Sequence, residues 1–180
     1  MLSGRALSSN DRLANLGKSF CIHHMSPRSR TSAGILMFRR RSDKIEFLLA
    51  HPGGPLFVHK DNGHWTIPKG EAVPGEDLLT RARIEFAEEV GLEPKGPYLP
   101  LGTIKQKGGK IVHAWAVEGD LPPGFVQCSN TFQLEWPPRS GQVQSFPEID
   151  RAEFFAEKLA RKKIKPAQAP FFDCLIAALD

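Results

Sequence analysis

A chain of 180 residues with 41% hydrophobic residues can bury a full core and is most simply one globular domain. The net charge of +4 does not indicate nucleic-acid binding, because residues 1–30 carry five basic residues and one acidic residue, and residues 31–180 are neutral overall. The three cysteines lack metal-type spacing, which is typical of a reducing cytosol. No apolar run is long enough to span a membrane. We therefore expect a cytoplasmic protein without nucleic-acid or membrane partners.

Residues 1–30 differ in composition from the rest of the chain. They are rich in Ser, Arg and Asn without a sustained apolar period, so we expect a disordered extension before a domain that covers residues 31–180. The spaced arginines also resemble an organelle transit peptide. An upstream start codon is an equal alternative, because Met25 opens Met-Ser-Pro-Arg-Ser-Arg just before the first predicted strand.

Two pairs of apolar runs predict β-hairpins, because a short polar or glycine-rich turn joins each pair. The expected strands are Ser32–Phe38 with Ile45–His51, and Leu99–Lys107 with Lys110–Val117. Between the hairpins, His64–Ile67 is expected to be a short strand that delivers the loop Pro68-Lys69-Gly70 to the next segment.

The residues after Gly75 predict a helix. Pro74-Gly75 is a turn signal, Glu76 and Asp77 favour the positive N-terminus of a helix, and Gly91 suits the position that ends one. At 100° per residue, one apolar stripe is formed by Leu79, Ala82, Phe86 and Val90.

Glu85, Glu88 and Glu89 stand at positions i, i+3 and i+4 of this helix, so their carboxylates crowd together. Two of them lie in the last turn, where the helix dipole disfavours anions by roughly 0.3–1 kcal/mol each. Such charge runs are most often solvated faces. Here the electrostatic cost indicates instead a site for a hard cation with oxygen ligands, Mg²⁺ or Mn²⁺.

The C-terminal third predicts one strand and two helices. Asn130–Trp136 is the expected strand, ended by Pro137-Pro138. Glu157–Ile164 begins a helix that stops near Pro166, and Ala169–Leu179 has apolar residues at helical spacing. The last helix is expected to pack in the core or in a dimer, which leaves a monomer and a homodimer both open.

The stretch Gly70–Leu92 resembles the Nudix box, Gly-x5-Glu-x7-Arg-Glu-apolar-x-Glu-Glu-x-Gly-apolar. Its fixed positions are occupied by Gly70, Glu76, Glu85, Phe86, Glu88, Glu89, Gly91 and Leu92. The chain departs from the motif at Ile84, where the family has an arginine that helps to hold the glutamates. Arg81 precedes Glu85 by one turn, and it is either a substitute partner or an ordinary i, i+4 surface pair.

This resemblance implies an α+β fold, the Nudix-type α/β/α sandwich, in which a mixed central sheet carries the box helix on one side and the C-terminal helices on the other. It also implies hydrolysis of a nucleoside diphosphate linked to another moiety, by attack of water on phosphorus. Glu85, Glu88 and Glu89 would be catalytic and would hold Mg²⁺ or Mn²⁺. Gly70 would let the loop backbone approach the site, and Glu76 would brace the loop.

Ser145–Phe155 resembles the Nudix segment that enters the last strand, where a glutamate often supplies an extra metal ligand or the general base. Glu148 is the matching candidate for both roles. Asp150 and Glu153 compete with it, and a surface acid without function is a further alternative.

Five basic residues are candidates for substrate binding. Pro-Lys-Gly at Lys69 is similar to the version of the box in dinucleoside polyphosphate and diphosphoinositol polyphosphate hydrolases. Lys69 either meets another phosphate there or is a solvated loop lysine. Lys105 and Lys107, with Lys110, either reach a polyphosphate from the hairpin tip or serve only as edge-strand charges. Arg139 lies in a loop with aromatic neighbours.

Three functions remain open for a small-molecule nucleotide substrate. The first is a metal-dependent pyrophosphohydrolase, and the second, within the same class, is a dinucleoside polyphosphate hydrolase of the diadenosine tetraphosphate type. The third is a Nudix-fold nucleotide-binding module without catalysis, which only Ile84 favours.

Overall fold

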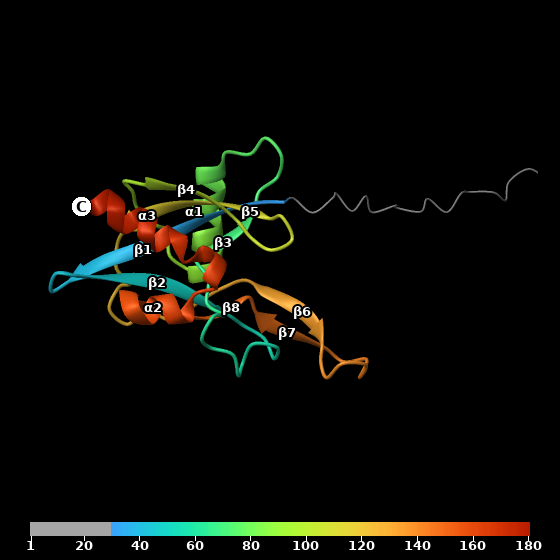
Figure 1. Ribbon diagram of the computed structural model, residues 1–180. Helices are drawn as coiled ribbons and strands as arrows, with labels where there is room; N and C mark the ends of the chain where they lie inside the picture. The colour runs from blue at the N-terminus through green and yellow to red at the C-terminus, as the bar shows by residue number, and fades with distance from the viewer. Residues whose placement is uncertain (1–29) are drawn as a thin grey trace, which may run out of the picture.

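The computed structural model describes residues 30–180, so the extension expected at residues 1–30 lies, apart from Arg30, outside the described residues. In chain order the elements are β1 (Thr31–Arg41), β2 (Lys44–Pro52), β3 (Lys69–Glu71), α1 (Leu78–Val90), β4 (Leu99–Lys105), β5 (Ile111–Glu118), β6 (Thr131–Glu135), β7 (Val143–Pro147), β8 (Ile149–Ala156), α2 (Glu157–Lys163), the 3₁₀ helix η1 (Pro166–Gln168) and α3 (Pro170–Leu179). Six strands form one sheet in the order β4-β5-β1-β2-β8, with β3 paired to β1, and β6 and β7 form a separate ribbon (Figure 1).

Strand β1 is the centre of the sheet. It pairs in parallel with β5 and antiparallel with β2 and β3, which makes the sheet mixed. Its side chains alternate between the two faces, Leu36 on one and Ile35 on the other, and both are fully buried. The turn to β2 uses Ser42 and Asp43 at φ 45° and 61°, the left-handed values that tight hairpin turns require.

Helices cover both faces of this sheet (Figure 1). Helix α1 buries Ala82, Phe86 and Val90 against one face. Helices α2 and α3 lie on the other face, where the ring of Phe172 stacks on Phe47 with centroids 4.2 Å apart. The predicted α+β sandwich is therefore confirmed, and α3 is a core helix. Within residues 30–180, no helix is long and apolar enough to cross a membrane.

The strand expected at His64–Ile67 is wrong in its placement. These residues make only isolated bridges, in which Thr66 faces Ala50 and Trp65 faces Ile164. The strand lies a few residues later, at β3, because Lys69–Glu71 pairs with the first residues of β1. The segment expected to be a loop is thus fixed to the central strand by main-chain hydrogen bonds.

The segment 145–155 is two strands rather than one. Strand β7 ends at Pro147 and β8 begins at Ile149, so Glu148 stands alone between them. Strand β7 forms because it pairs with β6, with Phe146 directly opposite Phe132. The resulting ribbon projects from the body of the protein (Figure 1), and Glu148 lies where the ribbon joins the sheet.

Candidate active site

Helix α1 is capped at both ends, so it begins and ends at defined residues. Asp77 is the N-cap, and its carboxylate accepts a hydrogen bond from the backbone N–H of Thr80 at 2.8 Å. Gly91 ends the helix at φ 82°, and its N–H donates to the carbonyl of Ala87 at 2.9 Å. With the apolar stripe buried, the acidic side of the helix faces strand β3.

Glu85 lies directly against the backbone of Gly70. A Cβ atom added at Gly70 would overlap the Glu85 carboxyl group, so any other residue at this position would displace the glutamate or the strand. This explains the glycine of the motif through a close approach of backbone and carboxylate.

Glu89 is tied to the adjacent residue of the same strand. The backbone N–H of Lys69 donates to Glu89 Oε2 at 2.9 Å. The pKa of Glu89 is raised to about 7, chiefly by burial and also by the charges of Glu85 and Glu148, whereas Lys69 opposes the shift through its charge and this hydrogen bond.

Arg81 supports Glu85 from the preceding turn. Its guanidinium lies 3.2 Å from Glu85 Oε1 and 3.2 Å from Glu76 Oε1, and Glu76 accepts the backbone N–H of Val73 at 3.0 Å. Burial raises the pKa of Glu85, Arg81 lowers it, and the neighbouring acids raise it. Ile84 is 40% exposed. The Arg81–Glu85 contact fits both alternatives for Arg81, and the contact of Glu76 with Val73 places it against the loop. The roles of Arg81 and Glu76 stay predictions.

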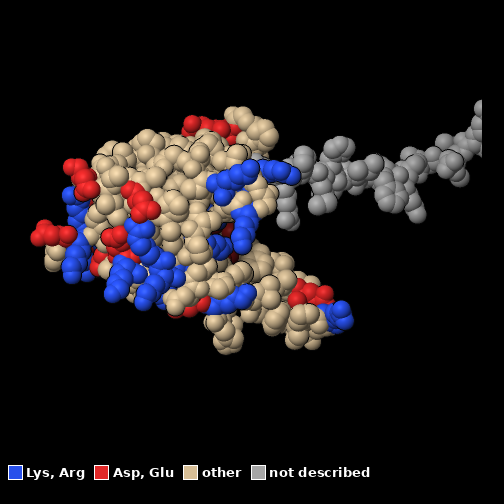
Figure 2. Space-filling model, viewed as in Figure 1, with Lys and Arg blue, Asp and Glu red and all other residues tan. Residues whose placement is uncertain are grey.

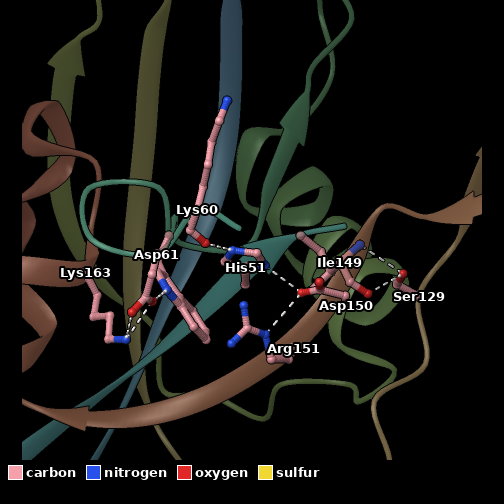
Figure 3. A network of polar contacts seen from close by, with 9 residues as sticks. His51, Lys60, Asp61, Ser129, Ile149, Asp150, Arg151 and Lys163 are labelled. Atoms are coloured by element: carbon pink, nitrogen blue, oxygen red, sulfur yellow. Dashed lines mark hydrogen bonds and ion pairs between the residues drawn. The ribbon is translucent and has the colours of Figure 1, made fainter. Parts of the chain in front are cut away.

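Glu88 and Glu148 are exposed, and each raises the pKa of Glu85 by its charge. Glu148 also raises the pKa of Glu89 by its charge, so it lies within electrostatic range of two helix carboxylates. Asp150 and Glu153, the two alternatives to Glu148, have other surroundings. The carboxylate of Asp150 is 2.7 Å from Nδ1 of the buried His51 (Figure 3), and Glu153 is an exposed residue of β8.

Three lysines from distant parts of the chain, Lys69, Lys110 and Lys165, act on one another, and two of them, Lys69 and Lys165, also interact with Glu89. Burial lowers the pKa of Lys69, with Glu89 opposing this and Lys165 and Lys110 adding to it by repulsion. Burial also lowers the pKa of Lys165, again with Glu89 opposing and Lys110 adding. Lys110 pairs with Glu71 at 2.9 Å. Figure 2 shows basic side chains around a hollow close to where the described chain begins.

Lys165 was not found from the sequence. It follows α2 in a segment without a motif, and its place depends on a backbone hydrogen bond from its N–H to the carbonyl of Trp65 at 2.8 Å. It is one of five basic residues between positions 158 and 165, so its charge alone did not distinguish it from its neighbours.

Three other candidates are not brought to the carboxylates. Lys105 and Lys107 are exposed at the tip of the β4–β5 hairpin. Arg139 occupies the loop at the far end of the β6–β7 ribbon, with φ 65°. Because β7 has five residues, this loop is about 16 Å along the strand from Glu148.

The donor chemistry of Glu85, Glu88, Glu89 and Glu148 fits a hard divalent cation, since all four supply carboxylate oxygens. Among residues 30–180, however, no three His, Cys, Asp or Glu side chains converge closely enough to hold a metal ion. Two of these carboxylates have partners within the protein, since Glu89 accepts the Lys69 N–H and Glu85 pairs with Arg81.

A family model of the NUDIX domain matches residues 28–175, most of the chain. The chain belongs to the Nudix family. Members of this family generally use a divalent metal ion.

Curated Nudix relatives match part of the chain. The bis(5'-nucleosyl)-tetraphosphatase (asymmetrical) of Caenorhabditis elegans is 39% identical over 61 residues, which cover 34% of this chain and 40% of that protein. The protein of the same name from Rattus norvegicus is 32% identical over 99 residues, which cover 48% of this chain and 63% of that protein. The chain thus spans less than two thirds of the length of these relatives.

Solved structures share the Nudix fold. A C. elegans Ap4A hydrolase binary complex superposes with a TM-score of 0.57 at 24% identity and covers 82% of this chain and 97% of its own. The NUDIX domain of Shewanella oneidensis NrtR, complexed with ADP ribose, superposes with a TM-score of 0.59 at 11% identity over 86% and 90% of the two chains. At these identities the likeness concerns the fold.

The raised pKa of Glu89 predicts a pH-dependent stability in metal-free protein. Folding raises this pKa from 4.5 to about 7, so the folded state binds more protons and its stability should fall as the pH rises from about 4.5 to about 7. The loss is of the order of 1–3 kcal/mol. Urea unfolding with EDTA at several pH values measures it. Glu89→Gln should flatten this slope, and parallel profiles for wild type and variant would contradict the prediction.

The Arg81 contacts predict a change in the titration of Glu85. Removing the guanidinium in Arg81→Ala should raise the pKa of Glu85, because Arg81 lowers it in the native protein. The melting temperature should change little, since a partly exposed ion pair contributes roughly 0–1 kcal/mol. Side-chain carboxyl NMR measures the titration. Arg83→Ala is the matched control, because Arg83 is on the same helix but pairs with Glu93 beyond the helix end, so this change should leave Glu85 unaffected.

Proposed function

We propose that this Nudix protein hydrolyses a phosphoric anhydride bond of a nucleotide derivative with the help of a divalent cation, Mg²⁺ or Mn²⁺. The observation that carries the proposal is the grouping of Glu148 with the carboxylates of α1, in which Glu85 and Glu89 are partly buried and are repelled by neighbouring carboxylates, Glu148 among them. Carboxylates held together at such a cost are expected where a cation or a reacting group is bound.

The protein residues have distinct roles in this proposal. Glu85, Glu88, Glu89 and Glu148 would hold the cation, which neutralises phosphate charge and acidifies a water nucleophile when bound. Gly70 keeps the strand backbone close to Glu85, and Arg81 holds Glu85 in position.

The reaction is a displacement at phosphorus. The oxygen of water forms a bond to phosphorus while the bond from phosphorus to the bridging oxygen breaks, and the electron pair leaves with the departing phosphate. The proton of the water passes to a carboxylate. Glu148 is our candidate for this base, because its side chain is exposed and its charge acts on the helix glutamates.

Metal-dependent turnover tests the proposal. Wild-type protein with Mg²⁺ should release phosphate or a nucleotide from a panel containing ADP-ribose and diadenosine tetraphosphate, and EDTA should abolish this. Glu89→Gln should lower kcat by about 100-fold or more, because it removes one charge from the site. Absence of turnover across the panel, with Mg²⁺ still raising the melting temperature, would favour the non-catalytic binding module instead.

A dinucleoside polyphosphate is the second candidate substrate. The names of the relatives from C. elegans and Rattus norvegicus support it. The grouping of Lys69, Lys110 and Lys165 supports it independently. Three ammonium groups that repel one another would be compensated by a chain of several phosphates better than by a single diphosphate.

This substrate class predicts a length-dependent effect of Lys69. Lys69→Ala should lower kcat/KM for diadenosine tetraphosphate by about tenfold or more, and it should affect ADP-ribose less, because the shorter chain reaches fewer lysines. Lys158→Ala, on the exposed side of α2, is the control. Equal losses for the two substrates, or a wild-type preference for ADP-ribose, would contradict the polyphosphate assignment.

A further inference from the structure

The segment 127–130 crosses from the end of α1 to the start of β8 without supplying any of the candidate catalytic residues. At one end, Gln127 Nε2 donates to the carbonyl of Glu89 at 2.5 Å, and the N–H of Asn130 donates to the carbonyl of Glu88 at 3.2 Å. These carbonyls belong to the last turn of the helix, where no intrahelical donor is available to them. The segment is therefore docked on the turn that carries two candidate metal ligands.

Gly91 permits this docking. A Cβ atom at Gly91 would come within 2.8 Å of the carbonyl oxygen of Cys128, which is closer than side chains tolerate. The glycine that ends the helix therefore also admits the segment to the helix end, a second reason for glycine at this position besides its φ of 82°.

At the other end, the segment holds the backbone of Glu148. The N–H of Glu148 donates to the carbonyl of Asn130 at 2.8 Å, and the carbonyl of Glu148 accepts the N–H of Gly53 at 2.9 Å. A line of main-chain hydrogen bonds thus runs from Gly53 through Glu148 and Asn130 to Glu88. Both backbone polar groups of Glu148 are engaged, each with a different part of the chain.

Ser129 provides side-chain hydrogen bonds between the segment 127–130 and the start of β8. Its hydroxyl accepts the N–H of Ile149 at 3.1 Å, and it lies 3.0 Å from the carbonyl oxygens of Ile149 and Asn130, to which its proton can be donated (Figure 3). One residue further on, Asp150 is held by His51. Glu148 is therefore fixed immediately after its own position by a hydroxyl group and then by a carboxylate–imidazole contact.

From these contacts we propose that Ser129 is a positioning residue for Glu148. Its hydroxyl fixes the corner between β7 and β8 to the segment docked on α1, and thereby sets the separation between Glu148 and the helix glutamates. The effect of Ser129 on catalysis rests on the proposed function. Ser129 is the informative residue to change, because the remaining hydrogen bonds between Glu148 and Asn130 and between Asn130 and Glu88 are made by backbone atoms.

The test compares Ser129→Ala with Ser129→Thr, which keeps the hydroxyl, and with Ser145→Ala, an exposed serine of β7. On a substrate that wild type hydrolyses with Mg²⁺, Ser129→Ala should lower kcat by about tenfold or more, because a small displacement of a catalytic group is costly. KM should change by less than about twofold. Ser129→Thr should recover most of the rate, and Ser145→Ala should match wild type. Unchanged kcat in Ser129→Ala would overturn the proposal.

Two further measurements separate positioning from general destabilisation. Amide hydrogen exchange at Glu148 and Ile149 should accelerate by about tenfold in Ser129→Ala, with the amides of α1 unaffected. In a Glu148→Gln background, Ser129→Ala should lower kcat no further, because the residue it positions is already changed. Equal acceleration along α1, or an additive loss of rate, would assign Ser129 a merely structural role.

The measurement of amide hydrogen exchange does not depend on turnover. If wild type hydrolyses no substrate of the panel, the proposed function fails, and the exchange rates at Glu148 and Ile149 still decide whether Ser129 holds this corner. Unchanged exchange in Ser129→Ala refutes the positioning role whether or not the enzyme is active.

Discussion

The close contact between the Glu85 carboxyl group and the backbone of Gly70 is the constraint on which the site depends. Helix α1 can lie this near to strand β3 only because one residue of the strand has no side chain. One turn later, Glu89 accepts the backbone N–H of Lys69. Successive helix turns thus engage successive strand residues, and the apolar packing of Phe86 holds the helix at this distance.

Burial makes the site electrostatically costly, and cations from other elements reduce that cost. Arg81 compensates Glu85 from within the helix, whereas Lys69 and Lys165 compensate Glu89 from β3 and from the segment after α2. The lysines are themselves partly desolvated, so neither set of charges is fully satisfied by the other. Such incomplete compensation of charge is typical of binding sites, where a protein loses some folding stability and gains affinity for its ligand.

Local patterns in the sequence determined much of the fold and part of the site. The spacing of glutamates, the caps at Asp77 and Gly91, and the apolar stripe of α1 all act within a few residues, so they could be recognised without tertiary information. Lys165 could not be recognised in this way, because its position depends on a backbone contact with Trp65, which lies about 100 residues earlier in the chain. The expectation for Arg139 missed that Phe132 and Phe146 pair into a projecting ribbon, which carries the loop away from the carboxylates.

The pKa of about 7 at Glu89 has a consequence for the stoichiometry of cation binding. At neutral pH a substantial fraction of the molecules carries a proton on this carboxyl group, and a cation that takes the oxygen as a ligand must displace that proton. Binding would therefore acidify a weakly buffered solution and would tighten as the medium becomes more alkaline. The number of protons released per bound cation, measured by calorimetry in buffers of different ionisation enthalpy, would report on the carboxyl groups that the cation takes as ligands.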